Sequence, residues 1–441
     1  MAETSASKLA KRIHTDGSTH YKSATAPANP VEGDLWYDET ANAFKFYNGS
    51  AFVKVSAAIP TLTSVSGTLY AGQTSDLTLA GTNFLAANLV VNFVQASDSI
   101  DVDVTVTPSS NTSATVTVPS SVYDNVTGGN AVTIKVTNSD SVDSDNQNTT
   151  AVALPTGGTI TSSGGYRYHK FTSSGTFTQT LSKTVEYLIV AGGGAGGGSN
   201  VGTNRLGGGG GAGGLRNGSV STTAQAYSIT VGAGGSGTTS NVGNTGGNSS
   251  ALGVTSSGGG GGGSGDAAAP ADDGANGGSG GGAGRGGDGG SGTSGQGNNG
   301  GDSVGPSNPQ SQGGGGGAGA VGNDGSTNNS SGNGNGGAGT NSYSAWATAT
   351  STGDSGYFAG GGGGGWHGSY TPTTNASGGA GGGGDGGDSS SDNSNAYGST
   401  GTANTGGGGG GNSSTAPHSG VSSAPDGPAG GSGIVLLRYQ L

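Results

Sequence analysis

The residue types that usually do chemistry occur in this sequence without the spacing that a catalytic or metal site needs. The histidines are scattered and show no ligand spacing: His14, His20, His169, His367 and His418. Matches to the GxGxxG pattern of dinucleotide sites arise by chance in so glycine-rich a chain. No serine or carboxylate pair stands out for hydrolysis, and there is no cysteine. We therefore predict that the protein is not an enzyme and uses no cofactor.

Two groups of aspartates are the best candidates for a bound cation. They are Asp98, Asp101 and Asp103, and then Asp140, Asp143 and Asp145. Carboxylate oxygens spaced in this way can hold Ca²⁺. Turns and solvated strand edges carry the same pattern, and we favour that interpretation, so no metal site is predicted.

Aromatic side chains in the glycine-rich half are few and clustered, which favours recognition over catalysis. Rings give a large contact area at low entropy cost, and neighbouring Asn, Asp and Ser add hydrogen bonds. Most of these rings flank the run Gly360–Gly365. The candidate contact residues are Tyr343, Trp346, Tyr357, Phe358, Trp366, His367, Tyr370 and Tyr397. The alternative is that Trp346 and Phe358 only cap the glycine block.

Composition excludes several protein classes. Of the 441 residues, 29% are apolar and 9% charged, both low for a globular chain, so a conventional core cannot run throughout. The 103 glycines lack the three-residue period of collagen. The net charge of −12 disfavours a nucleic-acid partner, because phosphate contacts need Lys and Arg. No apolar run approaches a membrane span of about 20 residues, so we expect no membrane insertion.

The glycine-rich part begins and ends on strand-like sequence. Only eight of the 103 glycines precede Gly157. The apolar segment Val185–Ala191 leads into the glycine block, and Gly433–Tyr439 follows it. A flexible linker has no reason to end in an apolar strand. We expect the two strands to join in one sheet that clamps residues 157–441 into a folded domain.

Between these strands, the glycine runs predict extended rods. A polyproline-II-type helix has about three residues per turn, and without side chains its neighbours can touch. Backbone N–H and C=O groups can then bond between rods, which offsets the large entropy cost of ordering glycine. The alternative is a flexible Gly/Ser coil. The expected rods are Gly207–Gly211, Gly258–Gly263, Gly313–Gly317, Gly360–Gly365, Gly381–Gly384 and Gly406–Gly411.

Residues 57–156 predict a β-sandwich. Short alternating segments bounded by turn residues are typical of that fold. They are 59–65, 76–84, 89–93, 101–106, 114–119 and 131–136. The sequence Leu77–Phe84, together with Val118-Pro119 and Val136–Asn138, resembles the IPT/TIG immunoglobulin-like family. That resemblance implies a spacer module.

Residues 1–56 predict a small β-meander behind a basic arm. Aromatic and polar residues alternate from Trp36 to Val55, and Asn48-Gly49 favours a type I′ hairpin turn. A sheet this small is not stable alone, so we expect it to pack against copies of itself or a neighbouring protein. We interpret residues 1–25 as a solvated arm, with an attachment segment as the alternative.

Several stretches resemble bacteriophage virion proteins. Tyr187–Gly194, Tyr227–Gly235 and Gly431–Tyr439 resemble landmarks of the glycine-rich domain of phage tail fibres and adhesins, which implies a polyglycine-II sandwich. The motif Gly33–Asp38 and the turn after it resemble a short repeat of virion appendages. Attachment to the virion would then use Trp36, Tyr37, Phe44, Phe46 and Tyr47.

The sequence thus predicts an all-β phage fibre or adhesin that binds the host surface through loops of its glycine-rich tip. Expected partners are other virion proteins at the N-terminal segment and a host polysaccharide or outer-membrane protein. A homo-oligomer is expected, for which a trimer is one arrangement. The chain would be made in the host cytoplasm, since its start lacks a signal peptide's apolar stretch, and would reside in the virion. The alternative is a structural capsid decoration or fibre protein without a specific receptor.

Overall fold

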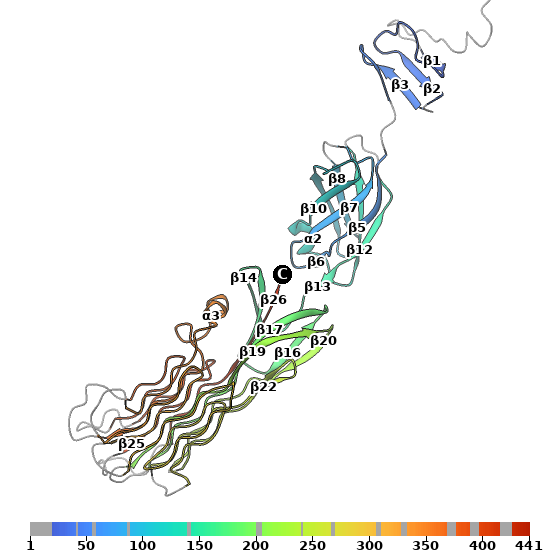
Figure 1. Cartoon of the computed structure of the whole chain (residues 1–441). Coiled ribbons are helices and arrows are strands. Elements are labelled where there is room, and N and C mark those ends of the chain that lie inside the picture. Colours follow the sequence, from blue (N-terminus) through green and yellow to red (C-terminus); the bar gives the residue numbers. More distant parts are fainter. Residues whose placement is uncertain are drawn as a thin grey trace, which may run out of the picture. The chain divides into compact units, whose positions relative to one another are not determined.

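The structure is a computed structural model that describes residues 20–40, 43–54, 59–85, 89–138, 143–199, 205–239, 241–265, 270–305, 310–327, 333–367, 376–388, 397–414 and 426–441. The chain divides into two compact units, Met1–Leu154 and Pro155–Leu441. Strands far outnumber helices in both units (Figure 1), which confirms the all-β fold class. The described helices are α2 (Ser120–Tyr123) and α3 (Ser344–Thr350). No helix in these stretches is long and apolar enough to cross a membrane.

The first unit begins with a four-stranded sheet. In order, its strands are β1 (His20–Ser23), β2 (Leu35–Asp38), β3 (Ala43–Tyr47) and β4 (Phe52–Lys54). β1 pairs in parallel with β2 along its whole length. The interpretation as a solvated arm is therefore wrong for His20–Ser23, because backbone groups of these residues form hydrogen bonds with β2. Residues 1–19 lie outside the described part of the chain.

The turn between β3 and β4 is not the expected type I′ turn. The N–H of Asn48 donates to the carbonyl of Ala51 at 3.1 Å, so Gly49 and Ser50 are the central residues. Only Gly49 has a positive φ, of 90°, as in a type II′ turn with glycine first. The side-chain oxygen of Asn48 accepts bonds from the N–H groups of Ser50 and Ala51. This local bonding fixes Asn48 outside the left-handed conformation that a type I′ turn demands.

Residues 61–153 form a β-sandwich with one core. One sheet has the order β10-β7-β5 and the other β12-β11-β8-β9, and β13 pairs with β6. Along β7 and β11, Leu77, Leu79 and Ile134 alternate inward and are fully buried. The strands are β5 (Thr61–Ser66), β6 (Tyr70–Ala71), β7 (Asp76–Thr82), β8 (Leu89–Gln95), β9 (Ile100–Val106), β10 (Ser113–Thr117), β11 (Ala131–Thr137), β12 (Gln147–Thr150) and β13 (Val152–Ala153).

The second unit is built on a five-stranded antiparallel sheet of order β14-β15-β26-β17-β19. β17 (Lys183–Val190) leads into the glycine block, and β26 (Ile434–Gln440) follows it. The two strands pair directly, from Glu186 with Arg438 to Val190 with Ile434. This pairing confirms that the end strands join in one sheet. The other strands are β14 (Thr159–Ser163), β15 (Tyr166–Phe171) and β19 (Leu215–Thr222).

Both faces of this sheet are covered, because consecutive residues of its central strands are apolar and successive side chains point to opposite faces. Leu188 and Leu436 face a core that α3 and Phe358 complete. Ile189 and Val435 face a second core. The elements over that second face are β16 (Gly175–Gln179), β20 (Gln225–Ile229), β21 (Ser249–Ala251) and β22 (Val254–Ser256). The sheet therefore lies between two packed layers, and it anchors the glycine block.

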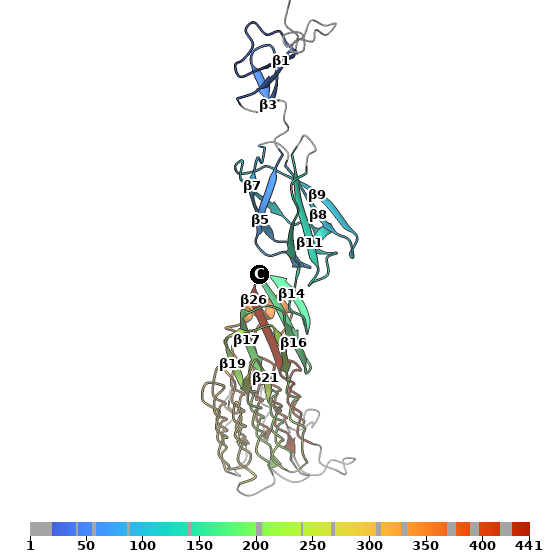
Figure 2. The ribbon, with the colours of Figure 1, turned by 90° about the vertical axis from the view of Figure 1, so that its right-hand side faces the viewer.

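The glycine block is a bundle of extended segments that run side by side from this sheet (Figures 1 and 2). Their hydrogen bonds repeat every three residues. In segment 207–214, every third N–H donates to the same neighbour: Gly207, Gly210 and Gly213 to segment 406–412, Gly208, Gly211 and Gly214 to 257–263, and Gly209 and Ala212 to 313–316. A period of three is that of a polyproline-II-type helix.

The same segment accepts bonds from segments 194–197, 279–282 and 362–365. Three neighbours that accept and three that donate give it six in all, which is hexagonal packing of polyglycine-II helices. A Cβ added to Gly210 would lie 2.2 Å from the carbonyl oxygen of Gly194, so no side chain fits there. For these residues the polyglycine-II prediction is confirmed and the flexible-coil alternative is wrong.

One expected rod is partly wrong. Gly381 and Gly382 have φ of 102° and 89° and form a turn, because the chain reverses there between neighbouring segments. Two short pairs of strands close the opposite end of the bundle. They are β18 (Arg205–Leu206) with β25 (Ser413–Ser414), and β23 (Gln310–Ser311) with β24 (Trp366–His367). We call that end the distal end and the other, next to the five-stranded sheet, the sheet end.

Candidate functional site

The described candidate contact residues of the glycine-rich half lie at two ends of the bundle. The extended run Gly360–Gly365 separates them, with Phe358 before it at the sheet end and Trp366 after it at the distal end. Eight steps along such a helix, at about 3.1 Å each, place these two residues roughly 25 Å apart. A cluster in the sequence is therefore two separate groups in space.

At the sheet end, α3 holds Trp346 against the five-stranded sheet. The Trp346 ring, 7% exposed, meets the Tyr168 ring edge-on at 5.9 Å and the Tyr343 ring at 6.3 Å between centroids. Thr161 and Lys170 donate side-chain hydrogen bonds to the carbonyls of Ala349 and Thr350 at the end of the helix. These bonds satisfy carbonyl groups that a helix end leaves without partners, so α3 is fixed in place.

Burial supports the capping alternative for two of the candidates. Phe358 is fully buried and shares the core under α3 with Trp346. A ring without exposed surface cannot touch a receptor while the fold is intact. Tyr357 is half-buried in a tight turn in which it exchanges backbone bonds with Asp354. Tyr343, also half-buried, lines two surface hollows, and Trp346 lines one of them.

Arg438 lies at the centre of this group. Its guanidinium carbon is 4.1 Å from the ring centre of Tyr166 and 4.3 Å from that of Trp346. Its Nε and Nη2 lie 2.8 and 2.7 Å from Oε2 of Glu186, and Nη1 donates to the Tyr168 hydroxyl at 3.2 Å. Burial disfavours the charged form of Arg438 and so lowers its pKa. The bonds to Tyr168 and Glu186 outweigh this effect, and the pKa of Arg438 is raised. The guanidinium is thus charged and fixed.

Sequence reasoning missed Glu186 and Arg438. Each is the single charged residue of its apolar end strand, Val185–Ala191 or Gly433–Tyr439. Antiparallel pairing of the two strands brings them face to face. A lone charge of opposite sign in each strand was the signal that would have found them.

Two adjoining hollows lie beside this cluster, and together we call them the sheet-end groove. One, of about 410 Å³, is lined by Glu186, Tyr187, Asn217, Gly218, Ser219, Ser342, Tyr343, Trp346 and Arg438. The other, of about 360 Å³, is lined by Leu215, Asn217, Gly295, Gln296, Gly297, Asn298, Ala318, Gly319, Thr340, Ser342 and Tyr343. Both volumes suit a small molecule. Glu186 is the sole carboxylate among these described lining residues, whereas glycoside hydrolysis normally uses two.

At the distal end, Trp366 and His367 belong to β24 and are 6% and 8% exposed. The Ser413 hydroxyl donates to the Trp366 carbonyl at 2.6 Å, which ties β24 to β25. Burial lowers the pKa of His367, although the nearby carboxylate of Asp388 opposes that shift. Tyr397 is 52% exposed, which makes it the accessible candidate ring here. Tyr370 lies outside the described residues.

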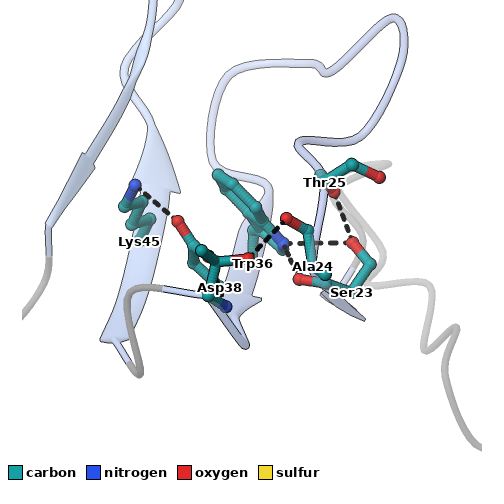
Figure 3. A network of polar contacts seen from close by, with 7 residues as sticks. Ser23, Ala24, Thr25, Trp36, Asp38 and Lys45 are labelled. Carbon is teal, nitrogen blue, oxygen red and sulfur yellow. Dashed lines mark hydrogen bonds and ion pairs between the residues drawn. The ribbon is translucent and has the colours of Figure 1, made fainter.

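The N-terminal sheet buries one candidate attachment ring. Trp36 is 5% exposed, and its Nε1 donates to the Ser23 carbonyl at 3.1 Å (Figure 3). The Lys45 ammonium lies 4.8 Å from the centre of the Trp36 ring and 2.8 Å from the Asp38 carboxylate. Tyr47 packs on this same face through Phe52. Trp36 therefore stabilises the sheet rather than offering a contact surface.

The other face of that sheet carries exposed aromatic rings. Phe44 and Phe46, two residues apart on β3, are 58% and 39% exposed. Tyr37 lies opposite Phe44 on β2, and their rings pack edge to face at 4.9 Å. Of the predicted attachment residues, these three share one face.

The aspartate groups belong to turn and strand networks. The backbone N–H of Thr127 donates to Asp98 at 2.7 Å, and this bond is the main reason that the pKa of Asp98 is lowered. Asp143 accepts a hydrogen bond from Lys135 at 2.9 Å. Within the described stretches, no group of three or more His, Cys, Asp or Glu side chains is placed to hold a metal ion. Asp140 lies outside these stretches.

Comparison with known proteins gives one family. A family model described as a glycine-rich domain matches residues 172–440. This range begins directly after β15, just before β16, and runs to the end of β26. A search of curated proteins finds no match to the chain.

Proposed function

The chain belongs to the glycine-rich domain family, and from that premise we propose that it is a phage virion fibre or adhesin. In this proposal the distal end of the bundle binds the host cell surface, and the first unit links the domain to the particle. Binding would be reversible, and several copies per particle would raise its avidity.

One observation carries the proposal: the described residues that flank a set of longer connections lie together at the distal end of the rigid bundle. The eight stretches of the second unit outside the described residues, from 200–204 to 415–425, are flanked by residues of the distal end. Those flanking residues bond to one another there, as Gly265 does to Gly198 and Ser311 to Ser326. Binding residues concentrate on loops that a rigid scaffold positions.

The sequence of these stretches suits recognition. Residues 389–396 read SSSDNSNA, and residues 368–375 read GSYTPTTN. Ser, Asn and Tyr are the residue types that adaptable binding loops favour. Tyr397 and Tyr370 are the rings that the proposal assigns to contact with a host polysaccharide or outer-membrane protein.

The first unit has two proposed roles. Its sandwich, which resembles the IPT/TIG family in sequence, would act as a spacer. Tyr37, Phe44 and Phe46 would contact other virion proteins or further copies of the chain, because an exposed aromatic face is typical of interaction sites.

The test is adsorption of the fluorescently labelled full chain to a panel of bacterial strains that differ in surface polysaccharide and outer-membrane proteins. We expect saturable binding to a subset of strains. Replacing residues 368–375 with a Gly/Ser stretch of equal length, or Tyr397→Ala, should weaken it at least tenfold. Tyr357→Ala, in a turn at the sheet end, is the matched control.

Two results would overturn the proposal. One is a folded, protease-resistant chain that binds no strain of the panel. The other is labelling of phage particles that finds many evenly spaced copies on the capsid, which would favour a structural decoration protein.

A further inference from the structure

The sheet-end groove has the chemistry of a ligand site and lies apart from the distal end. Its lining combines a half-buried ring, amide side chains, hydroxyl groups and one ion pair. Tyr343 and Asn217 border both hollows, so the two form a continuous path with Tyr343 at their junction. A linear ligand with repeating units fits such a path better than a single compact molecule does.

The groove is rigid before any ligand arrives. The Tyr343 ring stands edge-on to Trp346, with 86° between the planes. Trp346 in turn lies against the Arg438 guanidinium, which Glu186 and Tyr168 hold by hydrogen bonds. Side chains that are already ordered lose little entropy on binding. This arrangement is therefore preorganised for recognition.

The charge of the groove selects the ligand class. Arg438 and Glu186 neutralise each other, and no other charged residue is among the described lining residues. An anionic ligand would have to displace Glu186 from Arg438, in a chain of net charge −12. A neutral ligand meets no such cost. It can also use Oε1 of Glu186, since Nε and Nη2 of Arg438 both bond to Oε2.

We propose that the sheet-end groove binds a neutral, linear oligosaccharide. A sugar ring offers an apolar C–H face and a rim of hydroxyl groups. Tyr343 stacks on such a face at the junction of the two hollows. Glu186, Asn217 and Gln296 exchange hydrogen bonds with the hydroxyl groups on either side. With a single carboxylate in its described lining, the groove binds the chain without cutting it.

The test uses the full chain on an array of immobilised hexasaccharides. Neutral probes are malto-, cello-, manno-, galacto- and chito-oligosaccharides, and acidic probes are oligogalacturonate and oligosialic acid. We expect binding to at least one neutral series and weaker binding to the acidic ones. In solution titrations, Tyr343→Ala should weaken that binding at least tenfold, and Tyr343→Phe should keep it within about threefold. Asn217→Ala, on an exposed position of β19, tests the hydrogen bonds independently.

The distal variant Tyr397→Ala is the matched control and should bind the oligosaccharide as the unaltered chain does. The inference is overturned if no neutral series binds, if the acidic probes are preferred, or if Tyr343→Ala and Asn217→Ala both bind normally. It does not depend on the proposed function. Loss of cell adsorption in distal variants with intact oligosaccharide binding would separate the two sites.

Discussion

Glu186 and Arg438 are direct cross-strand partners in β17 and β26, with Oε2 and Nη2 2.7 Å apart. The pair joins residues on either side of the whole glycine block. Because Arg438 also lies between the rings of Tyr166 and Trp346, it links the closing strands to the layer formed by α3. This one side chain therefore connects the paired strands β17 and β26, the helix α3 and the sheet-end groove.

Arg438→Ala should destabilise the second unit by about 2 kcal/mol, mainly through lost stacking between two rings. The ion pair itself adds little, because the Glu186 side chain is 38% exposed and solvent screens it. Arg438→Lys keeps the charge but loses the planar, two-sided stacking, so we expect an intermediate loss. Denaturant unfolding followed by fluorescence measures this. An Arg438→Ala chain as stable as the original would contradict it.

Gly210→Ala should destabilise the bundle by about 3 kcal/mol or more, since overpacking is costly and the added Cβ would lie 2.2 Å from a backbone oxygen that cannot turn aside. Gly305→Ala is the matched control: no atom lies within 4 Å of its added Cβ and its φ is not positive. We expect that control to stay within about 0.5 kcal/mol of the original. Thermal unfolding and protease resistance compare the two, and equal behaviour would refute hexagonal packing at Gly210.

The sequence predicted the end strands and most of the extended glycine segments, but not which segments are neighbours in the bundle. Continuous apolar segments predicted β17 and β26, and glycine runs predicted extended segments, because each depends on local residue type. Glycine runs are interchangeable in sequence, however, so nothing local determines that segment 207–214 donates to 406–412 and 313–316. Those pairings arise from the packing of the whole bundle.

The candidate site was only partly predictable for the same reason. Tyr343 was identified by its residue type and lines the groove, but Glu186 comes from a strand far away in the sequence. The rings on either side of Gly360–Gly365 were grouped because they are close in sequence, although an extended segment separates them. α3 was missed because Ser344–Thr350 has no capping side chain and no charged residue.

Acid should destabilise the second unit through His169. This side chain is fully buried, and burial lowers its pKa from 6.5 to about 4, although a bond to the Gly157 carbonyl opposes the shift. The unfolded chain then binds the proton more readily than the folded one, so stability is complete above pH 6.5 and falls as the pH drops towards 4. We expect a loss of roughly 2 kcal/mol between pH 7 and pH 5.

His169→Gln removes this titration. The variant should be less stable than the original at pH 7, because the packing against Phe177 is lost, yet it should lose less stability between pH 7 and pH 5. Chemical denaturation of both chains at several pH values measures the difference. Parallel curves would show that another group causes the acid sensitivity.

The two faces of the N-terminal sheet should respond differently to substitution. Trp36→Ala removes a buried ring, so we expect β1–β4 to lose protease resistance. The double variant Phe44→Ser and Phe46→Ser changes rings that are 58% and 39% exposed, so the sheet should remain resistant. If this face joins copies of the chain, as we propose, that variant should sediment as a smaller species than the original at micromolar concentration. Sedimentation velocity of both full chains measures this difference. If the original chain is already monomeric, or if the variant forms the same assembly as the original, Phe44 and Phe46 take no part in self-association.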